Sequence, residues 1–311
     1  MVKALVGYSG FVGSNICNLT EFSNLYNSKN VAEAYNTCPD LLVYSGVPAA
    51  MFIANASPQK DFEIILEAID NIKKIKAKRV VLISTVAVYD RTSGVDETHI
   101  INEENILPYG KNRLYLENWV LENCEQSLIV RLPAIYGENL KKNFIYDYIN
   151  IIPKMLNQSK YSELGGFESE SVVFKNYELK EDDFYHCKNV DDKELFDYFC
   201  NNSFNATHFT DSRSVYQFYN LNKLWKDISI ALEHNIRLLN IATEPVSVAE
   251  LYYYICKKEF ENHLSKEPFN YNIKSVNAEL FGGKEGYMMD KNSVLEDIKM
   301  FVEEEIKKKW G

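Results

Sequence analysis

A glycine-rich turn near the amino terminus has the composition of a phosphate-binding loop. The apolar run Val2–Val6 leads directly into residues 7–15, which read Gly-Tyr-Ser-Gly-Phe-Val-Gly-Ser-Asn. Glycines permit a tight turn close to phosphates, and a helix that starts here supplies free N–H groups and a positive dipole end. The pattern predicts a pyrophosphate site, with a turn that binds no ligand as the alternative. The expected lining residues are Gly7, Ser9, Gly10, Phe11, Val12 and Gly13.

A second pair of residues has the spacing needed for proton transfer. Tyr109 and Arg113 stand at positions i and i+4, one helix turn apart on one face. A tyrosine with a pKa of about 10 is a poor base at neutral pH unless a fixed cation favours its phenolate. Arginine supplies a permanent charge but cannot release a proton. The pair predicts a proton-transfer tyrosine; the alternative is a core tyrosine beside a surface salt bridge.

Three segments together resemble the extended short-chain dehydrogenase/reductase family. The family's glycine turn reads roughly T-G-x-x-G-F-I-G, and Val6 stands here in place of the threonine. Residues 84–89 resemble S-S-x-x-V-Y-G. Residues 109–117 match Y-G-x-S-K-x-x-x-E, except that Arg113 replaces the family's lysine. The resemblance covers nearly the whole chain and is least specific beyond Asn139.

This resemblance implies an NAD(P)-dependent enzyme acting on a nucleotide-activated sugar, as an epimerase, a dehydratase or a ketosugar reductase. Thr85 would bond the substrate oxygen, and Tyr109 would exchange the proton during hydride transfer. Arg113 would replace the lysine that also holds the nicotinamide ribose. Dehydratases usually carry an Asp-Glu pair where Val86 and Ala87 stand, so a dehydratase is the least favoured. The rival hypothesis is a non-catalytic NAD(P)(H)-binding sensor, which Arg113 favours.

The turn after the expected second strand is where an adenosine ribose would lie. Residues 24–26 form a plausible strand, and Asn27, Ser28 and Lys29 follow it. In dinucleotide folds an acidic residue at this strand end grips the ribose hydroxyls. None stands here, and Ser28 with Lys29 suits a 2′-phosphate instead, which favours NADP(H). An ordinary polar turn is the alternative.

Two further segments resemble parts of the family that contact the cofactor. Residues 39–47 resemble its D-V-V-I-H-L-A-G strand, whose Ala-Gly end lies against the cofactor. Residues 131–137 resemble its R-P-x-x-x-Y-G segment, which passes the nicotinamide. The cofactor contacts implied by this resemblance are Ser45, Gly46, Val47, Pro133 and Ile135, besides Tyr109 and Arg113.

Strands and helices alternate along the first half of the chain. Residues 61–76 have apolar side chains at helical spacing, residues 79–88 form a buried-strand run, and residues 109–123 are predicted to be a second helix. This alternation predicts an α/β fold with a parallel, doubly wound Rossmann-type sheet. About 27 residues separate Gly13 from Asp40, too few for the usual two strands, so one βα unit is expected to be missing.

The chain is expected to divide into two parts. Residues 1–139, with returning elements at about 214–242, would form the Rossmann-type NAD(P)-binding domain. Residues 140–213 together with 243–311 would form a smaller, mainly C-terminal substrate lobe, because the periodicity weakens there. The pair Lys141–Lys142 would meet a diphosphate, with a solvated lysine pair as an equal alternative.

Composition restricts the possible partners. A net charge of −10 argues against binding to nucleic acid or to an anionic membrane as the main task. The six scattered cysteines, without C-x-x-C, indicate reduced thiols in the cytoplasm. The five histidines lack metal-ligand spacing, so no metal is predicted. No apolar run reaches the roughly 18 residues of a membrane span. A cytoplasmic protein with a nucleotide-sugar substrate is expected.

A homodimer is also expected. In the family, the helices corresponding to residues 61–76 and 109–123 usually pair with their mates across a two-fold axis. Their apolar surface suffices to cover the sheet and to leave some over. The residues that supply it are Phe62, Ile69, Ile72, Leu116, Trp119 and Val120.

Overall fold

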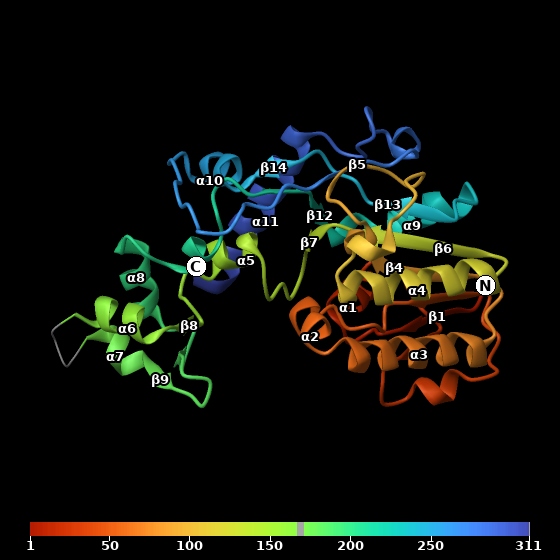
Figure 1. The fold of residues 1–311 in the computed structure, drawn as a ribbon, viewed down its shortest axis with the longest axis horizontal. Coiled ribbons are helices and arrows are strands. Elements are labelled where there is room, and N and C mark those ends of the chain that lie inside the picture. The colour runs from red at the N-terminus through yellow and green to blue at the C-terminus, as the bar shows by residue number, and fades with distance from the viewer. Residues whose placement is uncertain (167–170, 311) are drawn as a thin grey trace. The chain divides into compact units, whose positions relative to one another are not determined.

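The chain forms two compact units, described by a computed structural model over residues 1–166 and 171–310 (Figure 1). The first unit comprises Met1–Leu140, Val215–Val246 and Phe269–Asp297, and the second comprises Lys141–Ser214, Ser247–Pro268 and Ile298–Gly311. Residues 269–297, which the sequence analysis assigned to the substrate lobe, therefore lie in the first unit. One reason is the side-chain amide of Gln217, which bonds both the N–H and the carbonyl of Ile273.

The first unit is built on a parallel sheet. Its described strands run in the order β13-β6-β4-β3-β1-β2, and every neighbouring pair is parallel. This confirms the predicted doubly wound α/β fold. The strands are β1 (Lys3–Val6), β2 (Asn24–Tyr26), β3 (Leu41–Tyr44), β4 (Val80–Thr85), β6 (Ser127–Leu132) and β13 (Leu238–Asn240).

Helices cover both faces of this sheet, and most residues of its strands are apolar. Successive strand residues point to opposite faces: Leu42 packs among α3 (Pro58–Ile75) and α4 (Pro108–Asn123), whereas Val43 packs among α1 (Phe11–Cys17) and α9 (Leu224–Glu233). The predicted helix at 61–76 thus begins slightly earlier, at Pro58, because proline suits the first turn of a helix.

The connection from β2 to β3 confirms the missing βα unit. The described stretch between them carries the short 3₁₀ helix η1 (Val31–Ala34) in place of a further strand and helix, and β2 is the last strand of the sheet. Strand β1 therefore lies between β2 and β3, where the chain reverses its direction of winding. Ligands of such sheets bind at the carboxyl ends of the strands beside this point.

Shorter elements complete the first unit. Strand β7 (Ala134–Tyr136) pairs with β12 (Phe218–Asn220), and β5 (Ser93–Val95) pairs with β15 (Asn272–Ile273). The short helix α2 (Met51–Ala56) directly precedes α3. No helix of the described residues is both long and apolar enough to cross a membrane.

The second unit has its own core, which is rich in aromatic side chains. Its antiparallel sheet has the order β8-β10-β9, and Tyr161 stacks on Tyr185 with 3.6 Å between ring centroids. Helix α11 (Lys291–Trp310) begins in the first unit and ends in the second. The other elements are α5 (Phe144–Ile149), β8 (Met155–Leu156), α6 (Gln158–Gly165), α7 (Val172–Asn176), β9 (Tyr177–Leu179), β10 (Tyr185–Cys187), α8 (Lys193–Asn201) and α10 (Val248–Cys256).

Candidate functional site: the carboxyl edge of the sheet

Gly7, Gly10 and Gly13 form a glycine cradle between the end of β1 and the start of α1. Gly7 has a φ of +95°, and a Cβ atom there would lie 2.6 Å from the carbonyl carbon of Ser45. A Cβ atom on Gly13 would lie 2.1 Å from the carbonyl oxygen of Gly7. Both positions therefore require glycine for the backbone to pack.

Gly10 has a different environment within the cradle. Its φ is −82°, and the nearest atom to an added Cβ would be the Gly7 oxygen at 3.3 Å. The contact at Gly10 is tight but milder than those at Gly7 and Gly13. A glycine turn of this kind at the start of a helix suits a pyrophosphate.

The turns after β2 and β3 flank the glycine cradle. The carbonyl of Tyr26 accepts hydrogen bonds from the N–H groups of Gly7, at 2.7 Å, and of Tyr8, at 3.4 Å, which brings the turn with Asn27, Ser28 and Lys29 alongside. Ser28 and Lys29 are exposed. On the other side, the Ser45 N–H and hydroxyl both donate to the Val6 carbonyl, which fixes Ser45, Gly46 and Val47 beside the cradle.

Thr85 and Tyr109 meet at the same edge of the sheet. Thr85 is the last residue of β4, and Tyr109 is the second residue of α4. The Thr85 side chain lies close enough to the Tyr109 hydroxyl to lower its pKa. Gly110 permits this approach, because a Cβ atom there would lie 2.0 Å from the Ala87 carbonyl oxygen. The side-chain oxygen of Asn55, on α2, accepts the Tyr109 N–H at 2.9 Å and so fixes the start of α4.

Arg113 is buried beside Tyr109 and ion-paired. Its Nη1 donates to Asp61 on α3, and its Nη2 donates to the Pro48 carbonyl at 2.7 Å. Its guanidinium carbon lies 4.1 Å from the centroid of the Tyr109 ring. Asp61 could not be identified as a partner of Arg113 from the sequence, because the two residues are 52 positions apart along the chain.

The pKa of Tyr109 is raised above the ordinary tyrosine value. Burial of the ring is the largest cause, Arg113 opposes it, and the Asp61 carboxylate adds to it. Arg113 therefore acts on Tyr109 in the predicted direction, but its charge does not prevail. The contribution of Arg113 thus has the predicted sign, while the net effect of the surroundings is a raised pKa, with burial as the largest cause.

A second buried ion pair lies near the carboxyl edge of the sheet. Arg131, on β6, donates from Nε to both carboxylate oxygens of Glu117, at 3.2 Å and 3.0 Å, and from Nη2 to Oε2 at 2.6 Å. Ser84 donates to the same carboxylate. The Arg131 guanidinium lies over the Tyr89 ring, 4.8 Å from its centroid. These contacts join the ends of β4 and β6 to α4. In the sequence, the only indication of these contacts is Glu117 itself, the last residue of the 109–117 motif.

Pro133 and Ile135 follow β6 at this edge, where β7 pairs with β12. Ile135 is partly buried against the core beneath the sheet. Lys141 and Lys142 belong to the second unit. Within residues 1–166 and 171–310 there is no group of three or more His, Cys, Asp or Glu side chains that could hold a metal ion.

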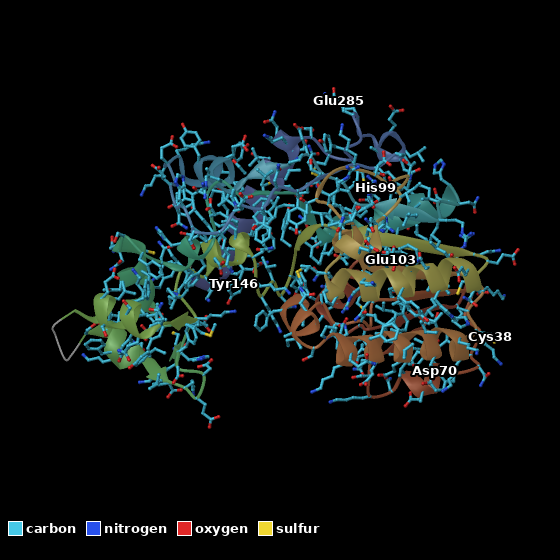
Figure 2. The ribbon with its side chains drawn as sticks, in the orientation of Figure 1. Cys38, Asp70, His99, Glu103, Tyr146 and Glu285 are labelled. Atoms are coloured by element: carbon cyan, nitrogen blue, oxygen red, sulfur yellow. The ribbon has the colours of Figure 1, made fainter. Side chains whose placement is uncertain are left out.

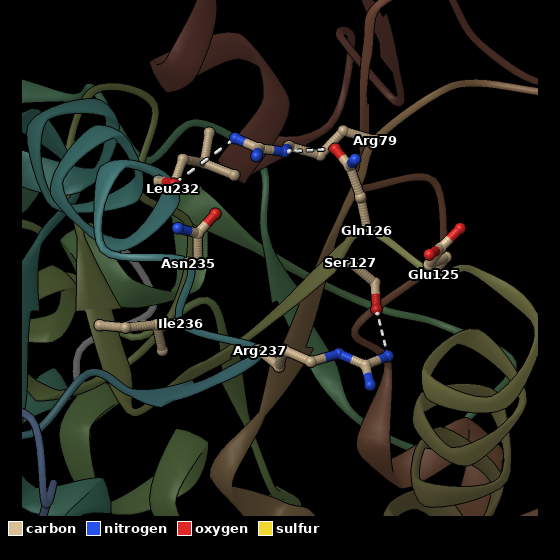
Figure 3. A pocket seen from close by; sticks show the side chains of 8 residues that line it. All are labelled: Arg79, Glu125, Gln126, Ser127, Leu232, Asn235, Ile236 and Arg237. Atoms are coloured by element: carbon tan, nitrogen blue, oxygen red, sulfur yellow. Dashed lines mark hydrogen bonds between the residues drawn. The ribbon is translucent and has the colours of Figure 1, made fainter.

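A cavity of about 140 Å³ lies at the opposite, amino-terminal edge of the sheet (Figure 3). Two arginines line it. Arg79 donates to the Leu232 carbonyl near the end of α9, and Arg237 donates to the Leu121 carbonyl near the end of α4. Both guanidinium groups thus satisfy helix carbonyls that lack partners within their helices. This cavity reflects the joining of helix ends and is separate from the candidate site.

Comparisons with known proteins agree with this architecture. The family described as RmlD substrate binding domain matches residues 12–156. A search of curated proteins finds no match. The chain is similar to a dTDP-4-dehydrorhamnose reductase from Bacillus anthracis, solved in complex with NADP, with 15% identity, coverage of 98% of this chain and 99% of that chain, and a TM-score of 0.63.

Two epimerase structures are similar to the same extent. The UDP-glucose 4-epimerase of Thermotoga maritima, solved with UDP-glucose, is 14% identical over 97% of this chain and 98% of that chain, with a TM-score of 0.62. A UDP-glucuronic acid 4-epimerase from Bacillus cereus, solved with NAD, is 16% identical over 99% of both chains, with a TM-score of 0.62. Together with the family match, these similarities confirm the predicted resemblance to extended short-chain dehydrogenase/reductases.

Proposed function

We propose that this chain, which has the fold of the extended short-chain dehydrogenase/reductases, is an NAD(P)-dependent oxidoreductase or epimerase of a nucleotide-activated sugar. The observation that carries the proposal is the proximity of the Thr85 and Tyr109 side chains at the carboxyl edge of the sheet that carries the glycine cradle. A proton-transfer group and a phosphate-binding turn at one edge are what hydride-transfer chemistry requires.

The glycine cradle is the proposed seat of the cofactor's pyrophosphate. Ser45, Gly46 and Val47 would line its other side, and Pro133 and Ile135 would lie along the nicotinamide half. Exposed Lys29, beside Ser28, would pair with a 2′-phosphate, so NADP(H) is favoured. The similar structures offer both precedents, since the reductase was solved with NADP and one epimerase with NAD.

The proposed chemistry uses two hydroxyl groups. When bound, the nicotinamide supplies or accepts the hydride. Thr85 would donate a hydrogen bond to the substrate oxygen and hold it against Tyr109. The Tyr109 hydroxyl would transfer the proton to or from that oxygen. Arg113 would keep the Tyr109 ring in place by its contact with the ring face. The second unit would bind the rest of the nucleotide sugar.

The alternative proposal is a dinucleotide-binding sensor without turnover. It is supported by Arg113, whose two terminal nitrogens donate to Asp61 and to the Pro48 carbonyl. A guanidinium held in this way is less able than a lysine to hold ribose hydroxyls. Under this alternative, dinucleotide binding persists and no nucleotide sugar is converted.

The test is an assay of dinucleotide oxidation with a panel of nucleotide ketosugars, together with dinucleotide titrations. The parent is expected to bind a dinucleotide and to turn over at least one sugar. A Gly10→Val variant is the control. A Cβ there would lie 3.3 Å from the Gly7 carbonyl oxygen, which needs to shift only slightly, so the variant should fold yet lose dinucleotide binding. A parent that binds no dinucleotide would refute the proposal, and one that binds without turnover would favour the sensor.

We further propose that two copies pair through α3 and α4. The structure buries Ile72, Leu116 and Val120 against the sheet, while Leu66 and Tyr115 on the same helices remain exposed by 44% and 48%. Light scattering is expected to give twice the chain mass at micromolar concentration. A single chain mass would contradict the pairing.

A further inference from the structure

Asp61 is a buried carboxylate next to the proposed proton-transfer site and has no role in the chemistry above. We propose that Asp61 is a positioning residue that neutralises Arg113 and thereby keeps Tyr109 protonated, so that at neutral pH the site favours reduction of a substrate carbonyl over oxidation of an alcohol. This inference rests on the proposed function and narrows it from two reaction types to one.

The contacts of Asp61 show how firmly it holds the arginine. Its Oδ2 accepts Arg113 Nη1 and also the side-chain amide of Asn112, the latter at 2.8 Å. The side chains of Arg113 and Asp61 are only 5% and 8% exposed. Because water does not screen such a pair, the two charges act on their surroundings nearly as a neutral unit. Arg113 Nη2 donates to the Pro48 carbonyl, so this nitrogen is also engaged within the protein.

The surroundings of Tyr109 favour its neutral form. The charged groups that act on it are Arg113 from its own helix and Asp61 from α3. Its polar neighbours are the Thr85 hydroxyl from β4 and, at its backbone N–H, the Asn55 side chain from α2. Arg113 lies over the face of the ring, and its charge lowers the pKa of Tyr109. Burial and Asp61 raise that pKa, and the net shift is upward.

A protonated tyrosine can begin a reaction in one direction. The substrate carbonyl carbon receives a hydride from a reduced nicotinamide dinucleotide, the carbonyl π bond breaks, and the oxygen takes the Tyr109 proton. The sugar is reduced to an alcohol, the dinucleotide is oxidised, and the phenolate left behind regains a proton from water. Oxidation of an alcohol would need the phenolate first, which this site disfavours.

The test measures the protonation of Tyr109 directly by NMR, with all tyrosines carrying ¹³C at Cζ and with Tyr109→Phe used to assign the signal. In the parent, Tyr109 is expected to stay protonated beyond pH 9. In Asp61→Asn, which leaves the arginine charge unopposed, Tyr109 is expected to ionise at a pH at least one unit lower than in the parent. A double variant, Asp61→Asn with Arg113→Gln, removes both charges and should return the titration to that of the parent or above.

Asp70→Asn is the matched control. Asp70 also lies on α3 and is labelled in Figure 2, but it is half-exposed and pairs with Lys74. It should leave the Tyr109 titration unchanged. Thermal unfolding monitors folding in each variant, and the double variant keeps the test valid if the single one unfolds.

Two results would overturn the inference: a parent in which Tyr109 ionises below pH 8, or a folded Asp61→Asn protein with an unchanged titration. Because the NMR measurement needs no turnover, it separates the two proposals. If the titrations behave as expected but the protein binds no dinucleotide, the role of Asp61 is supported and the proposed function is refuted. A parent that oxidises a nucleotide-sugar alcohol as fast as it reduces a ketone would refute the stated direction alone.

Discussion

The glycine cradle and the Tyr109–Arg113 pair lie at the same edge of one sheet but are built in different ways. The cradle is determined by backbone packing, since added Cβ atoms at Gly7 or Gly13 would collide with main-chain atoms. The proton-transfer pair depends on side chains from several elements, including Asp61 on α3. The glycine motif therefore predicts its local structure reliably. The chemistry of the Tyr109–Arg113 pair, by contrast, depends on neighbouring side chains that the motif does not include.

The largest effect on stability is expected where buried side chains join α4 to the carboxyl ends of β4 and β6. Replacing Glu117 by Gln leaves the buried Arg131 guanidinium without its carboxylate, which should cost about 3–5 kcal/mol of unfolding free energy. Glu122→Gln, an exposed change on the same helix, should cost little. Urea unfolding measures both. Equal stabilities of the two variants would show that the ion pair does not hold this edge.

Within the glycine cradle, a smaller contrast is expected. Gly13→Ala should destabilise the protein by roughly 1–3 kcal/mol, because its Cβ would lie 2.1 Å from the Gly7 oxygen. Gly10→Ala needs only a small adjustment and should stay close to the parent in stability while weakening dinucleotide binding. Thermal unfolding with and without dinucleotide checks both. If Gly10→Ala proved the less stable variant, the packing argument would be wrong.

The smallest effect concerns cofactor choice. Lys29→Ala should weaken NADP(H) binding about tenfold, or about 1.4 kcal/mol, and leave NAD(H) binding almost unchanged, because only the 2′-phosphate loses a partner. Lys226→Ala, at an exposed position on α9, is the control for net charge. Calorimetric titration gives both affinities. Equal losses for the two dinucleotides would remove Lys29 from the 2′-phosphate site.

The sequence predicts the fold better than the chemistry of its site. The apolar runs and glycine spacing identify the parallel sheet, and the short interval before Asp40 reveals the missing βα unit. The return of residues 269–297 to the first unit could not be predicted, because it depends on long-range hydrogen bonds such as that of Gln217 to Ile273.

The same limit applies within the site. Tyr109 and Thr85 are recognisable from local motifs, and the structure brings their side chains together. The balance of charge at Tyr109 is not local, since it depends on Asp61, which lies on a different helix from Arg113. The motif identifies Tyr109 and Arg113, but only the fold shows that the Asp61 carboxylate lies against the Arg113 charge.

The central claim is that Tyr109 transfers the proton in a dinucleotide-dependent reaction. The most direct measurement compares turnover and dinucleotide affinity for Tyr109→Phe, with Tyr115→Phe, at an exposed position on the same helix, as the control. Phenylalanine keeps the ring beneath Arg113 but has no proton to give. We expect Tyr109→Phe to lose nearly all turnover with dinucleotide affinity almost unchanged, and Tyr115→Phe to behave as the parent. Full turnover in Tyr109→Phe would contradict the account.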